Sequence, residues 1–408
     1  WQTVWLEPVP QSCIERVYTE TTIAASTVTV KYDLSNAKPG AQVIVRALDG
    51  ETVVSQGSEL VEGDSGSVLL SFDDLHLWCP SDPFLYSLII EITDGTGDVL
   101  DRVESYFGAR EVSCEPDDSG HMRLHLNGSP IFHLGLLDQG WWPDGLLTAP
   151  TDEALRFDIE ATLEMGFNTI RKHVKVEPAR WYWHADRLGV LVWQDMPSTV
   201  FNMVEFGKQL KKGVEPEEME WDSISPGKDP DGFRSELDAM LTALQPFPSI
   251  VAWVPFNEAW GQHDTNETLT HVMRFDPTRL VDGPSGWTDM GLGHMRDHHL
   301  YQGAEQLPEA ESGRATVYGE FGGISLYVDG HSMFEKGWGY TKTESVEDFL
   351  TSYEELLAVI GGLIPEGLAG AIYTQTTDVE SEINGLLTYD REYKVQPEKV
   401  RLIHERIL

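Results

Sequence analysis

Two glutamates carry the strongest chemical signal in this sequence. Glu258 follows the apolar run 250–254 in the segment PFNEAW, and Glu320 follows the run 315–318 in the segment YGEFGG. Two carboxylates facing each other across a pocket can cleave a glycosidic bond: one delivers a proton to the leaving oxygen while the other, ionised, attacks or stabilises the anomeric carbon. We therefore expect Glu258 to hold a proton near neutral pH.

The ordinary alternative for a single glutamate at a strand end is a salt bridge at the rim of the fold. Two glutamates in the same position relative to their strands, with Asn257 beside the first, favour the catalytic interpretation. An amide next to the acid can bind a sugar hydroxyl and strengthen that contact at the transition state.

Other polar side chains also come directly after apolar runs. Arg171 and His173 flank Lys172, so they face the same way in a strand and are expected to orient carboxylates and sugar hydroxyls. A buried ion pair that holds a layer of the fold is the alternative for Arg171, because a desolvated guanidinium needs a partner in any case. Asp138 and Gln375 are further candidates for contact with a substrate.

Histidines 294, 298 and 299 raise the question of a zinc site. No HExxH motif or nearby pair of acidic ligands accompanies them, so we predict neither a metal nor a cofactor. One of His298 and His299 is expected to face a substrate and the other to face away; His298 is our candidate. Among the tryptophans, most of which are expected to pack in the core, Trp338 is the candidate for stacking on the apolar face of a sugar.

The elements that must position these side chains form a repeating pattern after Phe107. Apolar runs typical of strands alternate with amphipathic helical stretches, such as the one that starts at Thr151 and ends near Gly166. The eight runs are 132–134, 169–170, 191–193, 250–254, 279–281, 297–300, 315–318 and 371–373. Repeated βα units favour a closed (β/α)8 barrel, in which chemistry lies at the carboxyl ends of the strands. The rival, an open doubly wound sheet, lacks its usual GxGxxG or GxxxxGK[ST] motif after the first strand.

The first quarter of the chain has a different character. Short β-branched runs separated by Asp, Gly, Ser and Pro clusters, without a helical stretch, predict a β-sandwich. We therefore expect a multidomain protein: residues 1–10 as the end of a preceding domain or a linker, residues 11–107 as the sandwich, and residues 108–408 as the barrel.

Composition limits the possible partners. The chain has 29 Lys and Arg against 67 Asp and Glu, a net charge of −38. Such a field repels phosphate backbones and anionic membranes, so neither is expected as a partner. No apolar run approaches the roughly 18 residues of a membrane span. Three scattered cysteines fit a reducing compartment weakly, which slightly favours the cytoplasm, although the opening WQTVWLEPVP indicates a longer polypeptide whose start could hide a targeting signal.

Together, the segments PFNEAW, YGEFGG and residues 166–197 (GFNTIRKHVKVEPARWYWHADRLGVLVWQDMP) resemble glycoside hydrolase family 2. The resemblance implies an immunoglobulin-like sandwich followed by a TIM barrel, preceded by a jelly-roll domain that this chain lacks. It implies a retaining exo-β-glycosidase with Glu258 as acid/base and Glu320 as nucleophile. The family often places a tyrosine near the nucleophile on the sixth strand, which makes Tyr301 a candidate.

Two departures from the family pattern bear on the substrate. After the eighth strand the family usually has a Trp platform, whereas this chain reads Tyr373-Thr374-Gln375. Within residues 108–408, the sequence has no Asn-x-Lys segment of the kind with which glucuronidases grip a carboxylate. We expect an oligosaccharide or glycoside as the substrate. β-Galactosidase is the first choice of activity, with β-mannosidase, β-glucuronidase and arabinosidase as alternatives. A non-catalytic carbohydrate-binding module is the rival from another class, and the sequence leaves the oligomeric state open.

Overall fold

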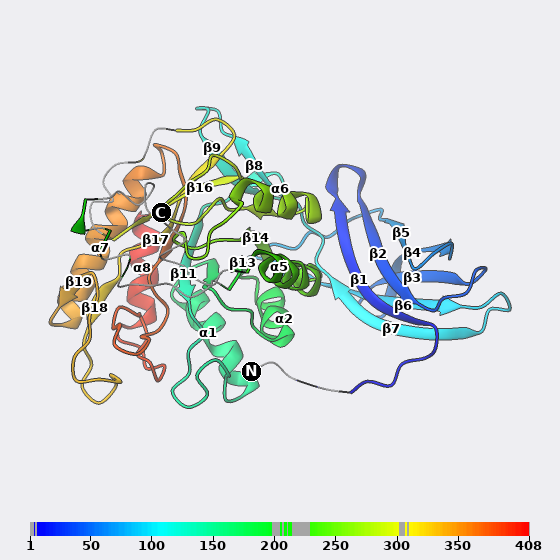
Figure 1. Cartoon of the computed structure of the whole chain (residues 1–408), viewed down its shortest axis with the longest axis horizontal. Coiled ribbons are helices and arrows are strands. Elements are labelled where there is room, and N and C mark those ends of the chain that lie inside the picture. The colour runs from blue at the N-terminus through cyan, green and yellow to red at the C-terminus, as the bar shows by residue number, and fades with distance from the viewer. Residues whose placement is uncertain are drawn as a thin grey trace.

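Two sheets packed face to face form the amino-terminal part of the computed structural model, on the right of Figure 1. The structure describes residues 4, 6–197, 205, 208–209, 211–213, 229–301, 307 and 310–407. One sheet has the order β1-β2-β5 and the other β4-β3-β6-β7. Their strands are β1 (Cys13–Thr22), β2 (Thr27–Ser35), β3 (Gln42–Asp49), β4 (Thr52–Leu60), β5 (Ser65–Ser71), β6 (Tyr86–Thr93) and β7 (Val99–Phe107), with a short helix η1 (Ile23–Ala25) after β1.

The sandwich core follows from alternation along the strands. In β2, Val28, Val30, Tyr32 and Leu34 are buried while the residues between them are not, because successive side chains of a strand point to opposite faces. These four pack with inward-facing residues of the other sheet, such as Val45 of β3. The expected β-sandwich is confirmed.

Eight parallel strands form the second part, on the left of Figure 1. Their order β15-β14-β13-β12-β11-β20-β17-β16 makes every strand a neighbour of the next one in the chain, and the parallel bridge Asp282–Met295 joins the two ends. The strands are β11 (His133–Asp138), β12 (Thr169–Lys172), β13 (Leu191–Asp195), β14 (Ile250–Val254), β15 (Leu280–Val281), β16 (Met295–Leu300), β17 (Ala315–Phe321) and β20 (Leu368–Tyr373). This is the predicted barrel, and each of the eight predicted runs contributes a strand.

Helices and small sheets cover the barrel. The helices are α1 (Asp152–Glu164), α2 (Ala179–Leu188), α5 (Pro230–Leu244), α6 (Thr265–Phe275), α7 (Val346–Leu363) and α8 (Pro397–Ile407). The smaller strands are β8 (Val112–Pro116), β9 (Met122–Leu126), β10 (Ser129–Pro130), β18 (Ile324–Leu326) and β19 (Thr341–Thr343). The side chain of Thr151 caps α1 as expected, and Gly166 takes the left-handed backbone just after it. No helix of the described residues is long and apolar enough to cross a membrane.

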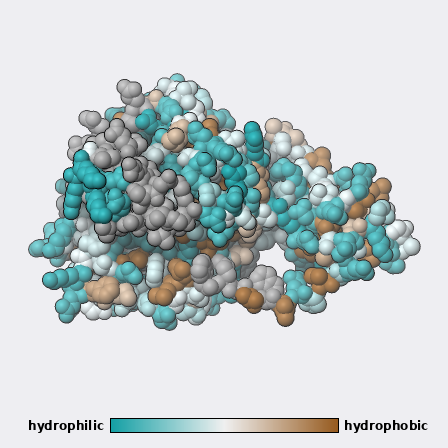
Figure 2. Space-filling view, viewed as in Figure 1, coloured by the Kyte–Doolittle hydropathy of each residue, from teal (hydrophilic) through white to brown (hydrophobic). Residues whose placement is uncertain are grey.

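Buried polar contacts anchor the segment that follows the sandwich to the barrel. Arg110, which follows β7, donates hydrogen bonds to the carbonyl oxygens of Pro248, Thr278 and Ile250 at 2.8–3.0 Å. Burial lowers the pKa of this guanidinium to about 9. The outer surface is different: hydrophilic residues cover much of the face on which α5 and α6 lie, as Figure 2 shows, in keeping with the acidic composition.

Candidate active site

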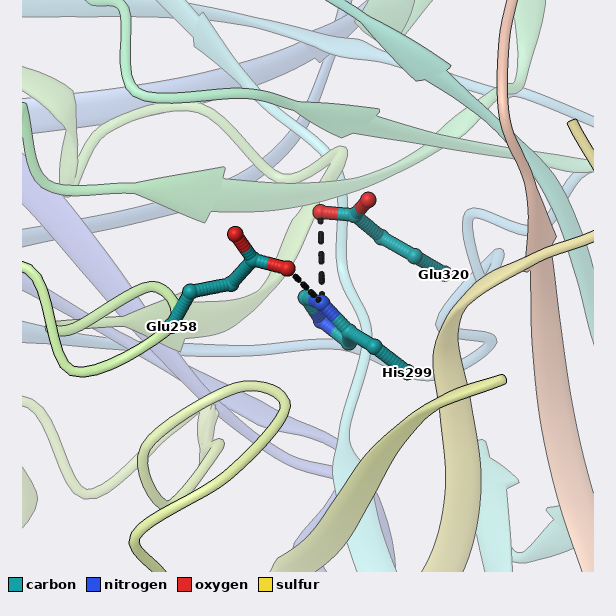
Figure 3. Close-up of side chains that lie close together, drawn as sticks. All are labelled: Glu258, His299 and Glu320. Atoms are coloured by element: carbon teal, nitrogen blue, oxygen red, sulfur yellow. Dashed lines mark hydrogen bonds and ion pairs between the residues drawn. The ribbon is translucent and has the colours of Figure 1, made fainter. Parts of the chain in front are cut away.

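Glu258, His299 and Glu320 converge at the carboxyl ends of the barrel strands (Figure 3). Oε1 of Glu258 lies 2.9 Å from Nδ1 of His299, and Oε1 of Glu320 lies 3.6 Å from the same nitrogen. One oxygen of each glutamate and one nitrogen of the histidine all lie within 4.8 Å of one another. The two carboxylates therefore face each other across the opening of the barrel, with the imidazole beside both.

The backbone after β14 aims Glu258 into this opening. Glu258 and Ala259 take left-handed backbone conformations, with φ of 51° and 60°, which residues other than glycine rarely adopt. The amide of Glu258 donates to the carbonyl of Ser285 at 2.9 Å, and Asn257 forms a parallel bridge with Ser285. The next strand connection thus fixes the turn that carries the glutamate.

Glu320 is contacted by three groups: two from β16 and its end, and one from β12. Tyr301 donates its hydroxyl proton to Oε2, while Arg171 approaches Oε1 at 3.4 Å through Nη1. Nδ1 of His299 is the third, at 3.6 Å. Because Glu320 is only 4% exposed, these contacts take the place of water around its carboxylate.

Arg171 links the two sides of the site. Its Nε and Nη2 both bond to Asp195 at 3.0 Å, and Nη2 also donates to Oδ1 of Asn257 at 2.7 Å. Burial alone would lower the pKa of this guanidinium, but the charges of Asp195 and Glu320 raise it above its ordinary value. Both interpretations made from the sequence therefore apply to Arg171: it forms a buried ion pair, and it orients the neighbours of Glu258.

The protonation of the acid differs from the sequence expectation. Burial would raise the pKa of Glu258, but the hydrogen bond and charge of His299 outweigh it, so the pKa lies below its ordinary value. Burial likewise would lower the pKa of His299, but the charges of Glu320 and Glu258 raise it. Without a ligand, the proton expected on Glu258 is thus drawn to the histidine.

The structure places His299, rather than the predicted candidate His298, between the two glutamates. Side chains alternate along β16, so Asp297 and His299 point into the barrel while His298 points out, half-buried. Burial lowers the pKa of His298, and none of its contacts reaches a glutamate of the site. Sequence alternation alone could not tell which histidine faces inward, because the register of the strand was unknown.

The remaining predicted residues divide into two groups. Asn257, Arg171, Tyr301 and His173 lie around the glutamates; Nδ1 of His173 is 3.2 Å from Asp195. Asp138 instead accepts hydrogen bonds from Lys172 at 2.5 Å and from the amide of Gly140. Because side chains alternate along a strand, the buried ion pair of Asp138 and Lys172 faces away from the interior side occupied by Arg171.

A second wall extends the site beyond Glu320. The rings of Tyr301 and Tyr340 stack with centroids 3.5 Å apart, and Trp338 packs edge-on against Tyr340 with its side chain half exposed. Gln375 is buried and donates to Asn384, whose own amide donates to Glu382 at 3.0 Å. Trp338 and Gln375, both predicted candidates, thus belong to this wall.

Several residues of the site had no individual signal in the sequence. Ser285, Asp297, Tyr340 and Glu382 meet the predicted residues only through the folded barrel. Burial raises the pKa of Glu382 to about 7, and the charge of Glu320 adds to the shift. Asp297 lies within a predicted strand, so alternation within that strand was the one signal that could have found it. Asp195 was visible in the sequence as a polar residue that follows the predicted run 191–193.

Two family models match this chain over the parts just described. The model described as "Glycosyl hydrolases family 2" matches residues 13–110, and the model described as "Glycosyl hydrolases family 2, TIM barrel domain" matches residues 148–302. With its sandwich, its barrel and its paired carboxylates, this chain is therefore of the glycoside hydrolase class. The chain belongs to glycoside hydrolase family 2, as the resemblance had indicated.

Curated relatives are similar over only part of their length. A β-galactosidase large subunit of Leuconostoc lactis is 28% identical over 244 residues, which cover 58% of this chain and 36% of the relative. A β-galactosidase of Clostridium acetobutylicum is 22% identical over 444 residues, covering all of this chain and 45% of the relative. The chain thus spans between about a third and a half of the length of these relatives.

Solved structures share the fold. The β-glucuronidase of Ruminococcus gnavus in complex with uronic isofagomine superposes with a TM-score of 0.73 at 19% identity, covering 97% of this chain and 69% of the other. At this level of identity the similarity establishes the arrangement of sandwich and barrel and leaves the substrate to be argued from the site.

Proposed function

We propose that this chain carries the catalytic centre of a retaining β-glycoside hydrolase that removes terminal sugars, with Glu258 as acid/base and Glu320 as nucleophile. The observation that carries the proposal is the approach of the two carboxylates, whose nearest ligand atoms lie within 4.8 Å. Retaining enzymes separate their carboxyl groups by about 5–5.5 Å, whereas inverting enzymes leave about 6.5–9.5 Å for a water molecule.

Each residue has a role in the two displacements. Glu320 attacks the anomeric carbon while Glu258 protonates the leaving oxygen, and Glu258 then removes a proton from the water that releases the sugar. Arg171 and Tyr301 hold the Glu320 carboxylate in position through their hydrogen bonds. Asn257, fixed by Arg171 through Oδ1, is left with an amide nitrogen that bonds to none of the described residues and is suited to a sugar hydroxyl.

Charge favours a neutral sugar as the substrate. Beside the two glutamates, Arg171 and His299 already pair with carboxylates, and Glu382 adds a further acid to the wall beside Glu320. A uronate would bring one more carboxylate into an environment that already holds those of Glu258, Glu320 and Glu382. β-Galactosidase activity, the printed function of several relatives, is therefore our first choice, ahead of β-mannosidase, arabinosidase and β-glucuronidase activity.

The proposal also covers the division of the chain. We assign residues 11–107 to the sandwich and residues 108–408 to the catalytic barrel, supported by the contact of Arg110 with barrel carbonyls just after that boundary. Residues 1–10 fall partly outside the described residues, and we assign them to the end of a preceding domain or a linker.

A panel of nitrophenyl β-glycosides tests the activity. Release of nitrophenol from the galactoside is expected in the parent, with a loss of at least about a hundredfold in Glu258→Gln and in Glu320→Gln. Glu335→Gln, on an exposed glutamate, is the matched control and should retain parent activity. NMR of the first product should show the β-anomer. No hydrolysis of any glycoside by the parent would leave a carbohydrate-binding module as the better interpretation. Full activity in both glutamate variants would exclude these two residues from catalysis, and loss of activity on addition of a chelator would point to metal-dependent hydrolysis.

A further inference from the structure

A buried chain of hydrogen bonds leads from Glu258 to Asp297 through His299 and Ser285. Nδ1 of His299 lies 2.9 Å from Glu258 Oε1, and Nε2 lies 2.8 Å from Ser285 Oγ. The hydroxyl of Ser285 in turn donates to Asp297 Oδ2. His299, Ser285 and Asp297 are at most 7% exposed, so water has little access to the chain.

These contacts determine which nitrogen of His299 titrates. Asp297 accepts both the Ser285 hydroxyl and the amide of Gly319. Because the Ser285 proton is used in this way, its oxygen accepts a hydrogen bond, and Nε2 of His299 must carry the proton that it receives. Nη1 of Arg171 lies 3.3 Å from Nε2, but it already donates to the Gly319 carbonyl. Nδ1 is therefore the nitrogen that gains or loses a proton.

The charges around the ring favour the imidazolium. Glu258, Glu320 and Asp297 face it from β14, β17 and β16, and Arg171 faces it from β12. Burial and the Asp297 charge raise the pKa of Asp282, behind Asp297, well above its ordinary value. Three carboxylates against one guanidinium, itself occupied by Asp195, stabilise a positive charge on Nδ1.

We propose that His299 stores the proton for acid catalysis on Nδ1 and supplies it to the leaving group through Glu258, while Ser285 and Asp297 act as positioning residues. The inference rests on the proposed function of Glu258 and Glu320. It accounts for an acid whose pKa the neighbouring His299 holds below its ordinary value and which must still donate a proton during the reaction.

The proton count closes over one turnover. As Glu320 bonds to the anomeric carbon it loses its negative charge, and His299 loses one of the carboxylates that stabilise it. The Nδ1 proton passes to Glu258 Oε1, and Glu258 gives a proton to the glycosidic oxygen, which leaves as an alcohol. In the second step Glu258 takes a proton from the attacking water. Once Glu320 is released as a carboxylate, that proton returns to Nδ1.

NMR titration of histidine-labelled protein tests the stored proton directly. The His299 signal is assigned by its loss in His299→Gln, and the free protein is compared with protein whose Glu320 is trapped by a dinitrophenyl 2-deoxy-2-fluoro-β-glycoside. We expect Nδ1 to be protonated at pH 7 in the free protein and its midpoint to fall by about one unit or more after trapping. A neutral His299 at pH 7, or a midpoint that trapping does not move, would overturn the inference.

Ser285→Ala provides a second measurement, with Ser285→Thr as the matched variant that keeps the hydroxyl. The alanine variant should lose at least about tenfold more kcat/KM on a phenyl glycoside, which needs acid assistance, than on a dinitrophenyl glycoside, which does not. The alkaline limb of its pH profile of kcat/KM should move to lower pH. Ser285→Thr should restore both the parent activity on the phenyl glycoside and the parent pH profile. Equal losses on the two substrates contradict the role of Ser285. Failure of Glu320 to be trapped, with no hydrolysis of any glycoside, refutes the proposed function instead.

Discussion

The hydroxyl of Tyr301 donates to Oε2 of Glu320, on the oxygen opposite the one that faces His299 and Arg171. Burial and the Glu320 charge raise the pKa of Tyr301, so the phenol keeps its proton and remains a donor. Each oxygen of the nucleophile thus has its own donor, which fixes the plane of the carboxylate for attack on the anomeric carbon.

Replacement of Tyr301 by phenylalanine should lower kcat/KM about 10- to 100-fold, since a hydrogen bond to a charged group contributes about 1.5–3 kcal/mol. Steady-state kinetics on nitrophenyl galactoside measures the loss. Tyr393→Phe is the control, because its hydroxyl donates to an exposed carboxylate, that of Glu164, on the surface. A Tyr301→Phe protein as active as this control would show that the contact does not serve catalysis.

Arg171→Met should both inactivate and destabilise the protein. The substitution leaves Asp195 buried without its guanidinium, and loss of one partner of a buried ion pair costs about 3–5 kcal/mol. Urea unfolding measures the change in free energy. Arg156→Met, which breaks an exposed ion pair with Glu160, should change the free energy of unfolding by about 0.5 kcal/mol or less. Similar losses in the two variants would mean that the Arg171 pair contributes little.

The sequence predicted the barrel because its strands are apolar on both faces and its helices carry caps. Thr151, Gly166 and Gly189 mark helix ends by local backbone chemistry, which needs no tertiary information. Glu258 and Glu320 were found for a similar reason: each follows or ends a strand, and the carboxyl ends of parallel barrel strands meet at one face.

What the sequence left open depends on strand register and on neighbours in space. A shift of one residue in β16 exchanges His298 for His299, and no local pattern excluded it. Asp138 was expected at the site because it ends β11, but Lys172 beside it in the sheet holds it in an ion pair. The expectation of a proton on Glu258 could not include the contact with a histidine 41 positions away in the chain, which lowers the pKa of that glutamate and is visible only in the folded protein.

The junction of sandwich and barrel is also open to test. Arg110→Met removes three hydrogen bonds from a charged donor to barrel carbonyls, which should lower the free energy of unfolding by about 2–4 kcal/mol. Chemical denaturation of the full chain measures the loss. Arg102→Met, on the exposed side of β7, is the control and should change it far less. A small effect at Arg110 would mean that water replaces the guanidinium at these carbonyls.

We expect Glu382 to make the substrate preference depend on pH. Its pKa is about 7, because burial and the charge of Glu320 raise it from the ordinary value of 4.5, so the carboxyl is neutral below pH 7 and ionised above it. The carboxylate of a uronide stays ionised over this range. Repulsion between the two therefore appears as the pH rises through 7. The ratio of kcat/KM for an aryl uronide to that for the galactoside should fall about five- to tenfold between pH 6 and pH 8, as expected for two charges in a partly buried site.

The ratio of the two substrates isolates this effect, because the protonation states of Glu258 and His299 enter both rate constants and cancel. Glu382→Gln removes the titrating charge while keeping the side-chain length and an oxygen that can accept from Asn384. Its ratio should be flat across the same pH range and should lie near the parent value at low pH, where Glu382 is already neutral. Glu335→Gln, on an exposed glutamate nearby in the sequence, should follow the parent curve. A parent ratio that does not change with pH, or a Glu382→Gln protein that keeps the parent slope, would show that this carboxyl does not face the bound sugar.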